Sequence, residues 1–65
     1  MEVKYYVSVW TWNGMEYEPR IVYESEDLDE VKKEYEALNA DNDHALIELW
    51  EIGDDDNNRI DYKEA

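Results

Sequence analysis

The dipeptide Asn13-Gly14 stands between two runs rich in Val, Tyr and Trp, and it constrains the fold more than any other feature. The two runs cover residues 2–12 and 15–23, and their β-branched and aromatic residues favour strands. Asn-Gly between two such runs is the strongest local signal for a β-hairpin, because a type I′ turn needs positive φ at both central residues. The sequence therefore predicts a hairpin with a two-residue turn.

A helix is predicted after the hairpin. Ser25 or Asp27 can cap its N-terminus, and Asp27 followed three residues later by Glu30 has the form of a capping box. Polar turn residues at 39–43 end the helix. The apolar residues that recur at helical spacing and form one stripe are Leu28, Val31, Tyr35 and Leu38.

Two further strands complete the order ββαββ. They cover residues 45–52 and 59–63, with a polar turn between them. Pro19 has no amide hydrogen and so favours a sheet edge for the second strand, and the short, polar fourth strand also suits an edge. We therefore expect one α+β domain over residues 1–65, with a four-stranded antiparallel sheet in the order 2-1-3-4 and the helix packed on one face.

Alternation along the strands predicts which side chains face the helix. The set expected beneath the helix is Val3, Tyr5, Val7, Val9, Ala45, Ile47 and Leu49. The set expected on the open face is Tyr6, Trp10, Trp12, Leu46, Trp50 and Ile52, joined across the turn by Met15 opposite Trp12 and Tyr17 opposite Trp10. A β-bulge near Pro19 is also expected, because it would move Ile21 and Tyr23 under the helix.

All three tryptophans are thus predicted on the face that the helix leaves open, and two interpretations of them stay open. The rings can shield the uncovered side of a thin sheet through cross-strand pairing. They can also form a platform for a partner or a second copy, since exposed apolar patches mark interaction sites and Trp and Tyr are frequent binding anchors. The residues of this candidate aromatic face are Trp10, Trp12, Tyr17 and Trp50.

The charge of the chain is strongly negative. Its 65 residues include 19 Asp and Glu against 6 Lys and Arg, a net charge of −13. Solubility of a small domain needs a magnitude of only about 2–8, and the excess repulsion costs stability. Solubility or adaptation to high salt would explain some acids, but we expect an acidic surface that binds a partner. Its candidate residues are Glu16, Glu18, Glu26, Asp29, Glu30, Glu34, Asp54, Asp55 and Asp56.

No motif in the chain indicates an enzyme or a cofactor. His44 is the one histidine and is predicted to be an ordinary residue at the end of a strand, and two glycines are too few for a phosphate-binding loop. The absence of cysteine excludes disulfides and thiolate zinc sites. Residues 54–65 begin with calcium-loop spacing, yet Arg59 replaces the required glycine and Ala65 the final glutamate. We expect no catalytic residues, metal or cofactor there, only an acidic turn with at most weak cation binding.

In size, charge and element content the chain resembles the small acidic inhibitors that phages and mobile elements encode, among them DNA-mimicking restriction inhibitors and anti-CRISPR proteins. The resemblance is global and includes no diagnostic motif, so it assigns no residue. It implies a non-enzymatic protein that occupies the basic nucleic-acid-binding site of a partner, such as a CRISPR effector subunit, and blocks binding of target DNA without touching nucleic acid itself. The alternative is a small interaction module that dimerises or binds a partner through the aromatic face.

The expected location is the cytoplasm, and a monomer is favoured over a homodimer. No apolar run approaches the 18 or so residues of a membrane span, and the first residues do not begin a secretory signal. Thirteen negative charges occupy about 22 Å of duplex DNA, while a compact chain of this length is about 28 Å across. The two linear charge densities are comparable, which favours binding to a basic groove.

Repulsion among the acids predicts how stability responds to salt and pH. Added salt, or mild acidification toward the isoelectric point of about 4.1, should raise the Tm because it screens or neutralises like charges. Thermal unfolding followed by circular dichroism over a salt series and a pH series measures both responses. A Tm that falls steadily under both treatments would show that specific ion pairs, and not repulsion, dominate.

Overall fold

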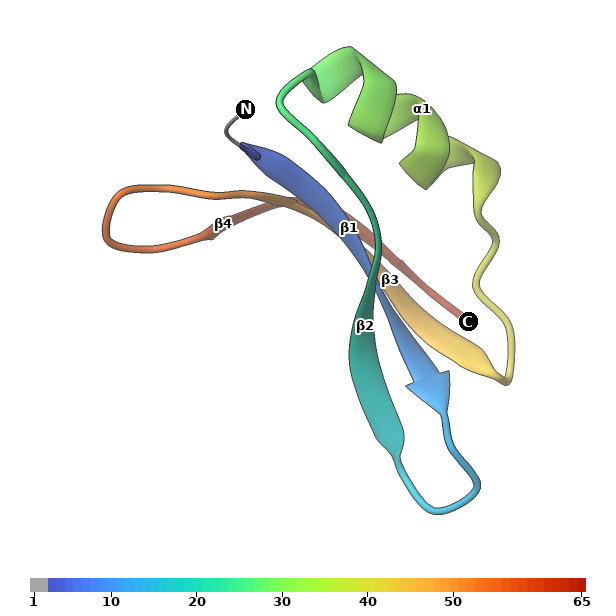
Figure 1. The fold of residues 1–65 in the computed structure, drawn as a ribbon. Helices are drawn as coiled ribbons and strands as arrows, with labels where there is room; N and C mark the ends of the chain where they lie inside the picture. The colour runs from blue at the N-terminus through green and yellow to red at the C-terminus, as the bar shows by residue number, and fades with distance from the viewer. Residues whose placement is uncertain (1–2) are drawn as a thin grey trace.

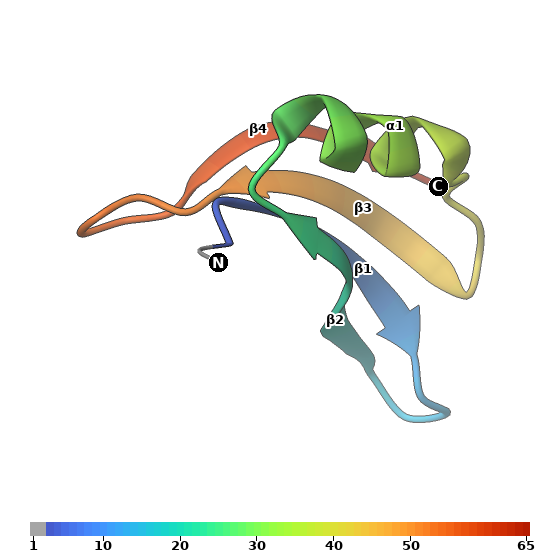
Figure 2. The same ribbon diagram turned by 45° about the horizontal axis from the view of Figure 1, so that its top comes forward.

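A computed structural model describes residues 3–65, shown in Figure 1. The elements are β1 (Tyr5–Trp12), β2 (Tyr17–Ser25), α1 (Leu28–Ala37), β3 (His44–Glu51) and β4 (Asn58–Glu64). The strands form one sheet in the order β2-β1-β3-β4 with every neighbouring pair antiparallel, and α1 covers one face of it (Figure 2). The α+β class and the predicted strand order are confirmed. Glu2, which was predicted in the first strand, lies outside the described residues.

The turn between β1 and β2 contains four residues instead of the predicted two. Trp12 pairs with Tyr17, and not with Met15. Gly14 has a φ of 102°, and no non-glycine residue among 3–65 has positive φ, so the predicted type I′ turn does not form. The side-chain oxygen of Asn13 accepts hydrogen bonds from the backbone N–H groups two and three residues further on, both at 2.9 Å. These bonds stabilise the longer turn and shift the pairing of the two strands.

The expected β-bulge in β2 occurs at Val22, further along the strand than Pro19. Ile21 pairs with Ser8, and the next paired residue is Tyr23. Tyr23 packs against the core beneath α1, as predicted. Ile21 does not, and its side chain is 58% exposed. Because the bulge lies beyond Ile21, this edge-strand residue is not moved under the helix; it lines a hollow with Trp10 and Trp50 on the open face and another beside Leu38 at the end of α1.

The hydrophobic core lies between the sheet and α1. Its buried apolar side chains are Val7, Val9, Val31, Tyr35, Ile47 and Leu49. Tyr5 and Leu38 pack against them and are partly buried, as predicted, while Val3 and Ala45 are only half-buried. Leu28 departs from the prediction, because it lies at the first position of the helix, one turn before Val31, and remains 36% exposed.

The start of α1 is fixed by Asp27 and Ser25. The Asp27 carboxylate accepts a hydrogen bond from the backbone N–H of Asp29 at 3.0 Å, which makes Asp27 the N-cap. The predicted capping box is not formed, because the Glu30 carboxylate instead accepts a bond from the Ser25 hydroxyl at 3.0 Å. This contact ties the first turn of the helix to the end of β2. Acids at this end of the helix also interact favourably with the helix dipole.

The assigned core predicts that truncation to Ala lowers the free energy of unfolding more at Leu49 than at Leu28. Leu49→Ala should lower the free energy of unfolding by about 2–5 kcal/mol, a large part of the roughly 3–10 kcal/mol expected for a chain of this length. Leu28→Ala at a 36% exposed position should cost less than about 1 kcal/mol. Urea unfolding of both variants measures the difference, and equal losses would contradict the assigned core.

Candidate interaction surfaces

The sheet face opposite α1 has a buried carboxylate at its centre. Glu48 of β3 lies between two core residues, points to the opposite side of the sheet from them, and is 6% exposed. It accepts hydrogen bonds from the Trp10 indole N–H at 2.7 Å, from the Ser8 hydroxyl at 3.3 Å and from the Arg59 guanidinium at 3.0 Å. One side chain therefore connects β1, β3 and β4.

The Glu48 carboxylate stays ionised at neutral pH. Burial raises its pKa, but hydrogen bonds from Trp10, Arg59, Trp50 and Ser8 outweigh burial and hold the pKa below its ordinary value of 4.5. No buried side-chain nitrogen or oxygen among residues 3–65 lacks a hydrogen-bond partner. The polar network is thus fully satisfied, which is the condition under which it stabilises a fold.

Glu48 and Arg59 are site residues that were not predicted from the sequence. Glu48 is the one charged residue in the run ALIELW, and alternation places it between Leu46 and Trp50 on the open face. An ionised group among apolar neighbours needs hydrogen-bond donors close by. A single charged residue in an apolar strand could therefore have indicated a hydrogen-bonded site. Ser8, directly opposite in β1, supplies one of the donors.

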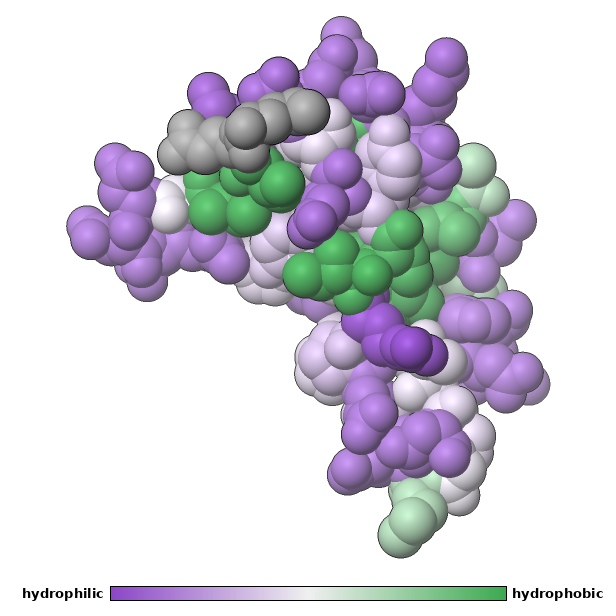
Figure 3. All heavy atoms as spheres, viewed as in Figure 1, coloured by the Kyte–Doolittle hydropathy of each residue, from purple (hydrophilic) through white to green (hydrophobic). Residues whose placement is uncertain are grey.

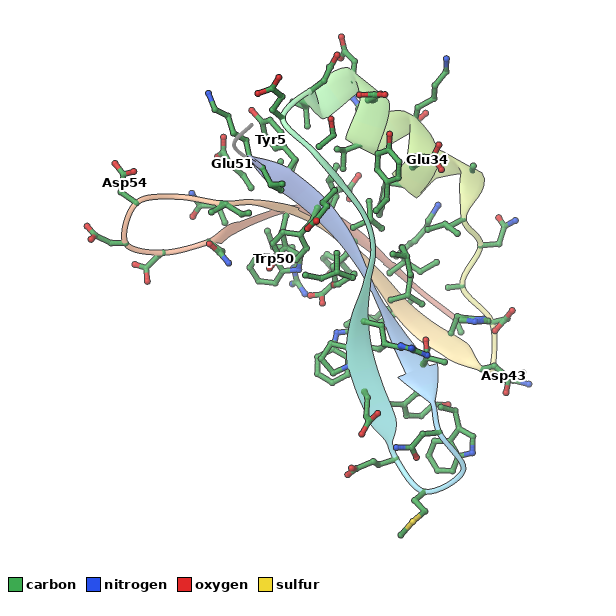
Figure 4. The ribbon with its side chains drawn as sticks, viewed as in Figure 1. Tyr5, Glu34, Asp43, Trp50, Glu51 and Asp54 are labelled. Atoms are coloured by element: carbon green, nitrogen blue, oxygen red, sulfur yellow. The ribbon has the colours of Figure 1, made fainter. Side chains whose placement is uncertain are left out.

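Aromatic rings surround this network and form a shallow hollow. The hollow has a volume of about 350 Å³, and it is lined by Tyr6, Ser8, Trp10, Pro19, Arg20, Ile21, Glu48 and Trp50. The rings of Tyr6 and Trp50 are stacked, with centroids 6.2 Å apart and an interplanar angle of 9°. Figure 4 shows Trp50 in the angle between the two hairpins, on the side away from α1. Trp10 and Trp50 therefore share the predicted open face.

Trp12 and Tyr17 form a second aromatic cluster near the tip of the β1–β2 hairpin. Their ring centroids lie 5.0 Å apart, and the side chains are 43% and 41% exposed. The Tyr17 hydroxyl donates to the Asn42 carbonyl at 2.8 Å, which ties this hairpin to the loop before β3. Trp10 pairs with Pro19, so the predicted pairing of Trp10 with Tyr17 is wrong. The candidate aromatic face consists of two clusters and is not one continuous surface.

The candidate acidic residues lie in three exposed groups. Glu16 and Glu18 belong to the β1–β2 hairpin, Glu26, Asp29, Glu30 and Glu34 belong to α1 and its approach, and Asp54, Asp55 and Asp56 form the β3–β4 turn. Among residues 3–65, Arg59 forms an ion pair with Glu48, and the His44 ring lies 3.1 Å from Asp41 and pairs with it when protonated. None of the candidate acids takes part in one.

These acidic groups occupy the periphery and leave the hollow between them. The β1–β2 and β3–β4 hairpins diverge, so their acidic tips point in different directions (Figure 1). The start of α1 lies at the same end of the molecule as the β3–β4 turn, because Val3 borders one hollow with Glu26 and Glu30 and another with Asp54. The candidate acids are therefore not confined to one face of the molecule, and further exposed acids lie on β2, on α1, in the loop before β3 and on β4.

His44 opens β3 and is held in the preceding turn. Its Nδ1 lies 3.1 Å from Oδ1 of Asp41, and the same oxygen accepts backbone N–H bonds from His44 at 2.8 Å and Asp43 at 2.9 Å. These bonds, led by the one from the His44 backbone, hold the pKa of Asp41 below its ordinary value. Over the described part of the chain, no three His, Asp or Glu side chains are grouped to hold a metal ion.

Comparisons with protein-family models, curated proteins and solved structures found no match to this chain. Within residues 3–65, the helix present lacks the length and apolar character needed to cross a membrane. The function is therefore inferred from the charges, packing and shape of the surface.

The buried network predicts a pH-dependent effect of Glu48→Gln. The substitution keeps the side-chain shape but removes the charge that Arg59 and Trp10 contact, so the free energy of unfolding at pH 7 should fall by about 1–3 kcal/mol. Because the folded pKa lies below the ordinary value of 4.5, the stabilisation by Glu48 is complete above that value. It is lost as the pH falls through the lowered folded pKa.

Urea unfolding of wild type and Glu48→Gln at neutral and acidic pH measures this effect. The stability gap between them should close as the pH falls below about 4.5. Glu64→Gln, at an exposed position of β4, serves as the control and should show no such gap. A gap between wild type and Glu48→Gln that stays constant with pH would contradict the assigned role.

Proposed function

We propose that this chain is a non-enzymatic acidic protein that occupies the basic nucleic-acid-binding site of a partner protein in place of DNA. The observation that carries this proposal is the set of unpaired surface carboxylates. The internal ion pairs of the described residues engage Asp41 and Glu48, so the acids of α1 and of both hairpin tips are free to contact Lys and Arg. A partner that binds them breaks no ion pair within residues 3–65.

The density of charge supports competition with duplex DNA. The molecule measures 35 × 24 × 18 Å and has a net charge of −13. Duplex DNA of the same 35 Å length carries about 20 charges, so the protein presents about two-thirds of that number. Charges of this density attract a basic cleft over a distance and accelerate association.

The partner we propose is a bacterial DNA-binding complex, such as a CRISPR effector or a restriction enzyme. The chain resembles the inhibitors of these complexes in size and charge. It would act in the host cytoplasm and bind before target DNA is engaged, with no cofactor. The partner's phosphate-binding Lys and Arg residues are the expected contacts.

A competition assay tests this function. The wild-type protein should prevent a purified, DNA-free CRISPR effector or restriction enzyme from binding labelled duplex DNA, and added salt should weaken the inhibition. Glu30→Lys with Glu34→Lys should reduce it by about tenfold or more, because two attractions become repulsions. Glu30→Asp with Glu34→Asp preserves the charge and serves as the matched control. Inhibition that is equally strong in the lysine variant, or absent with every enzyme of both classes, would refute the proposal.

A further inference from the structure

The geometry points to a docking site for a basic, amphipathic α-helix of the partner in the angle between the two hairpins. This inference rests on the proposed function, since it specifies which part of a basic partner the chain binds. The site has an apolar hollow at its centre and an acidic hairpin tip on either side. The hollow and the two acidic tips lie on different parts of the surface.

The centre of the site is a concave surface that no helix or strand of residues 3–65 covers. Figures 1 and 2 show α1 on one face of the sheet and the ends of the two hairpins diverging from each other. The half-buried rings of Tyr6, Trp10 and Trp50 line the hollow there together with Ile21, which is 58% exposed. In Figure 3 hydrophilic surface covers α1 and most of both hairpin tips. Such a hollow accepts the apolar stripe of a helix.

The charges in and around the hollow decide what else the partner must carry. Glu48, which lines the hollow, is already paired with Arg59 at 3.0 Å, and Arg20 also lines the hollow. A cation therefore gains nothing at the centre, where an apolar side chain is favoured. The free carboxylates lie at the tips, where the residues are Glu16 and Glu18 on one hairpin and Asp54, Asp55 and Asp56 on the other.

A basic amphipathic helix matches this arrangement in both length and charge. A helix of about 20 residues is 30 Å long, close to the 35 Å longest dimension of the molecule. Its apolar side chains would fill the hollow while its Lys and Arg residues reach the acidic tips. A second copy of this chain fits less well, because it also has a charge of −13 and would bring like-charged tips together.

A synthetic peptide provides the first test. The probe is a helical peptide of about 18 residues made of Leu and Lys, with Leu at positions i, i+3, i+4 and i+7. Its control has the same composition in an order that breaks the apolar stripe. Calorimetry and tryptophan emission should show that the striped peptide binds about tenfold or more tightly than its control. Equal affinity for the two peptides would overturn the inference.

Adjacent residues of β2 provide a matched pair of variants. Ile21 and Val22 are 58% and 52% exposed, and both line the hollow beside the end of α1, but only Ile21 also lines the hollow with Trp10 and Trp50. Ile21→Gln should weaken binding of the striped peptide by about tenfold, and Val22→Gln should leave it unchanged. Both side chains lie at the surface, and circular dichroism checks that both variants fold. Equal affinity in the two variants would contradict docking in the hollow.

Charge reversals separate this docking site from general attraction. Glu16→Lys with Glu18→Lys should weaken peptide binding more than Glu30→Lys with Glu34→Lys, which changes the net charge equally but lies on α1. Equal losses of affinity would show attraction to the overall charge, which overturns this inference and leaves the proposed function standing.

Two further outcomes separate the two proposals. Peptide docking as expected, with no inhibition of any DNA-binding enzyme, would overturn the proposed function alone. A dimer of the free chain in sedimentation equilibrium that Ile21→Gln dissociates would identify a second copy as the occupant, and would also overturn the inference.

Discussion

The buried carboxylate of Glu48 organises the side of the sheet that has no helix to cover it. Its hydrogen bonds to Trp10, Ser8 and Arg59 join three of the four strands. An ionised group this deeply buried is costly unless donors surround it, so the positions of the neighbouring rings follow from its presence. The tryptophan Trp10 is consequently both a structural donor and part of an accessible surface. The two interpretations of the tryptophans that the sequence leaves open are compatible at this residue.

The hydrogen-bond network around Glu48 also separates the surface of the hollow from the acidic surface at the hairpin tips. Arg59 is engaged by Glu48 and lies 4.1 Å from the centroid of the Tyr62 ring, so among residues 3–65 Arg20 is the charged residue of the hollow that forms no ion pair. The candidate acids of the periphery form no ion pair within the described chain and are available to cations. A surface with an apolar centre and acidic flanks is complementary to a different partner from a surface that is negative throughout. Specificity of this kind comes from the placement of charges more than from their number.

Much of the fold and part of the candidate site could be predicted from the sequence. The lack of an N–H on Pro19 placed β2 at an edge, and the alternating valines of β1 identified the core face, because both effects depend on residue type alone. The exposed acids at the tips could be identified for the same reason. Glu48 could not be assigned a role, since its environment depends on donors from Trp10 and Arg59, which are 38 and 11 residues away in the chain.

The sequence by itself determined the order of the elements, the strand order and the negative charge, because hydrophobic periodicity, turn residues and composition are local properties. Tertiary structure decided the register of β1 against β2, the position of the bulge at Val22 and the separation of the aromatic residues into two clusters. In the first case the alternatives are a two-residue and a four-residue turn. The Asn13 side chain and the pairing along the whole hairpin selected the longer one. The Asn13 bonds are local, but the strand pairing and the stacking of Tyr6 on Trp50 join distant residues that only the folded chain brings together.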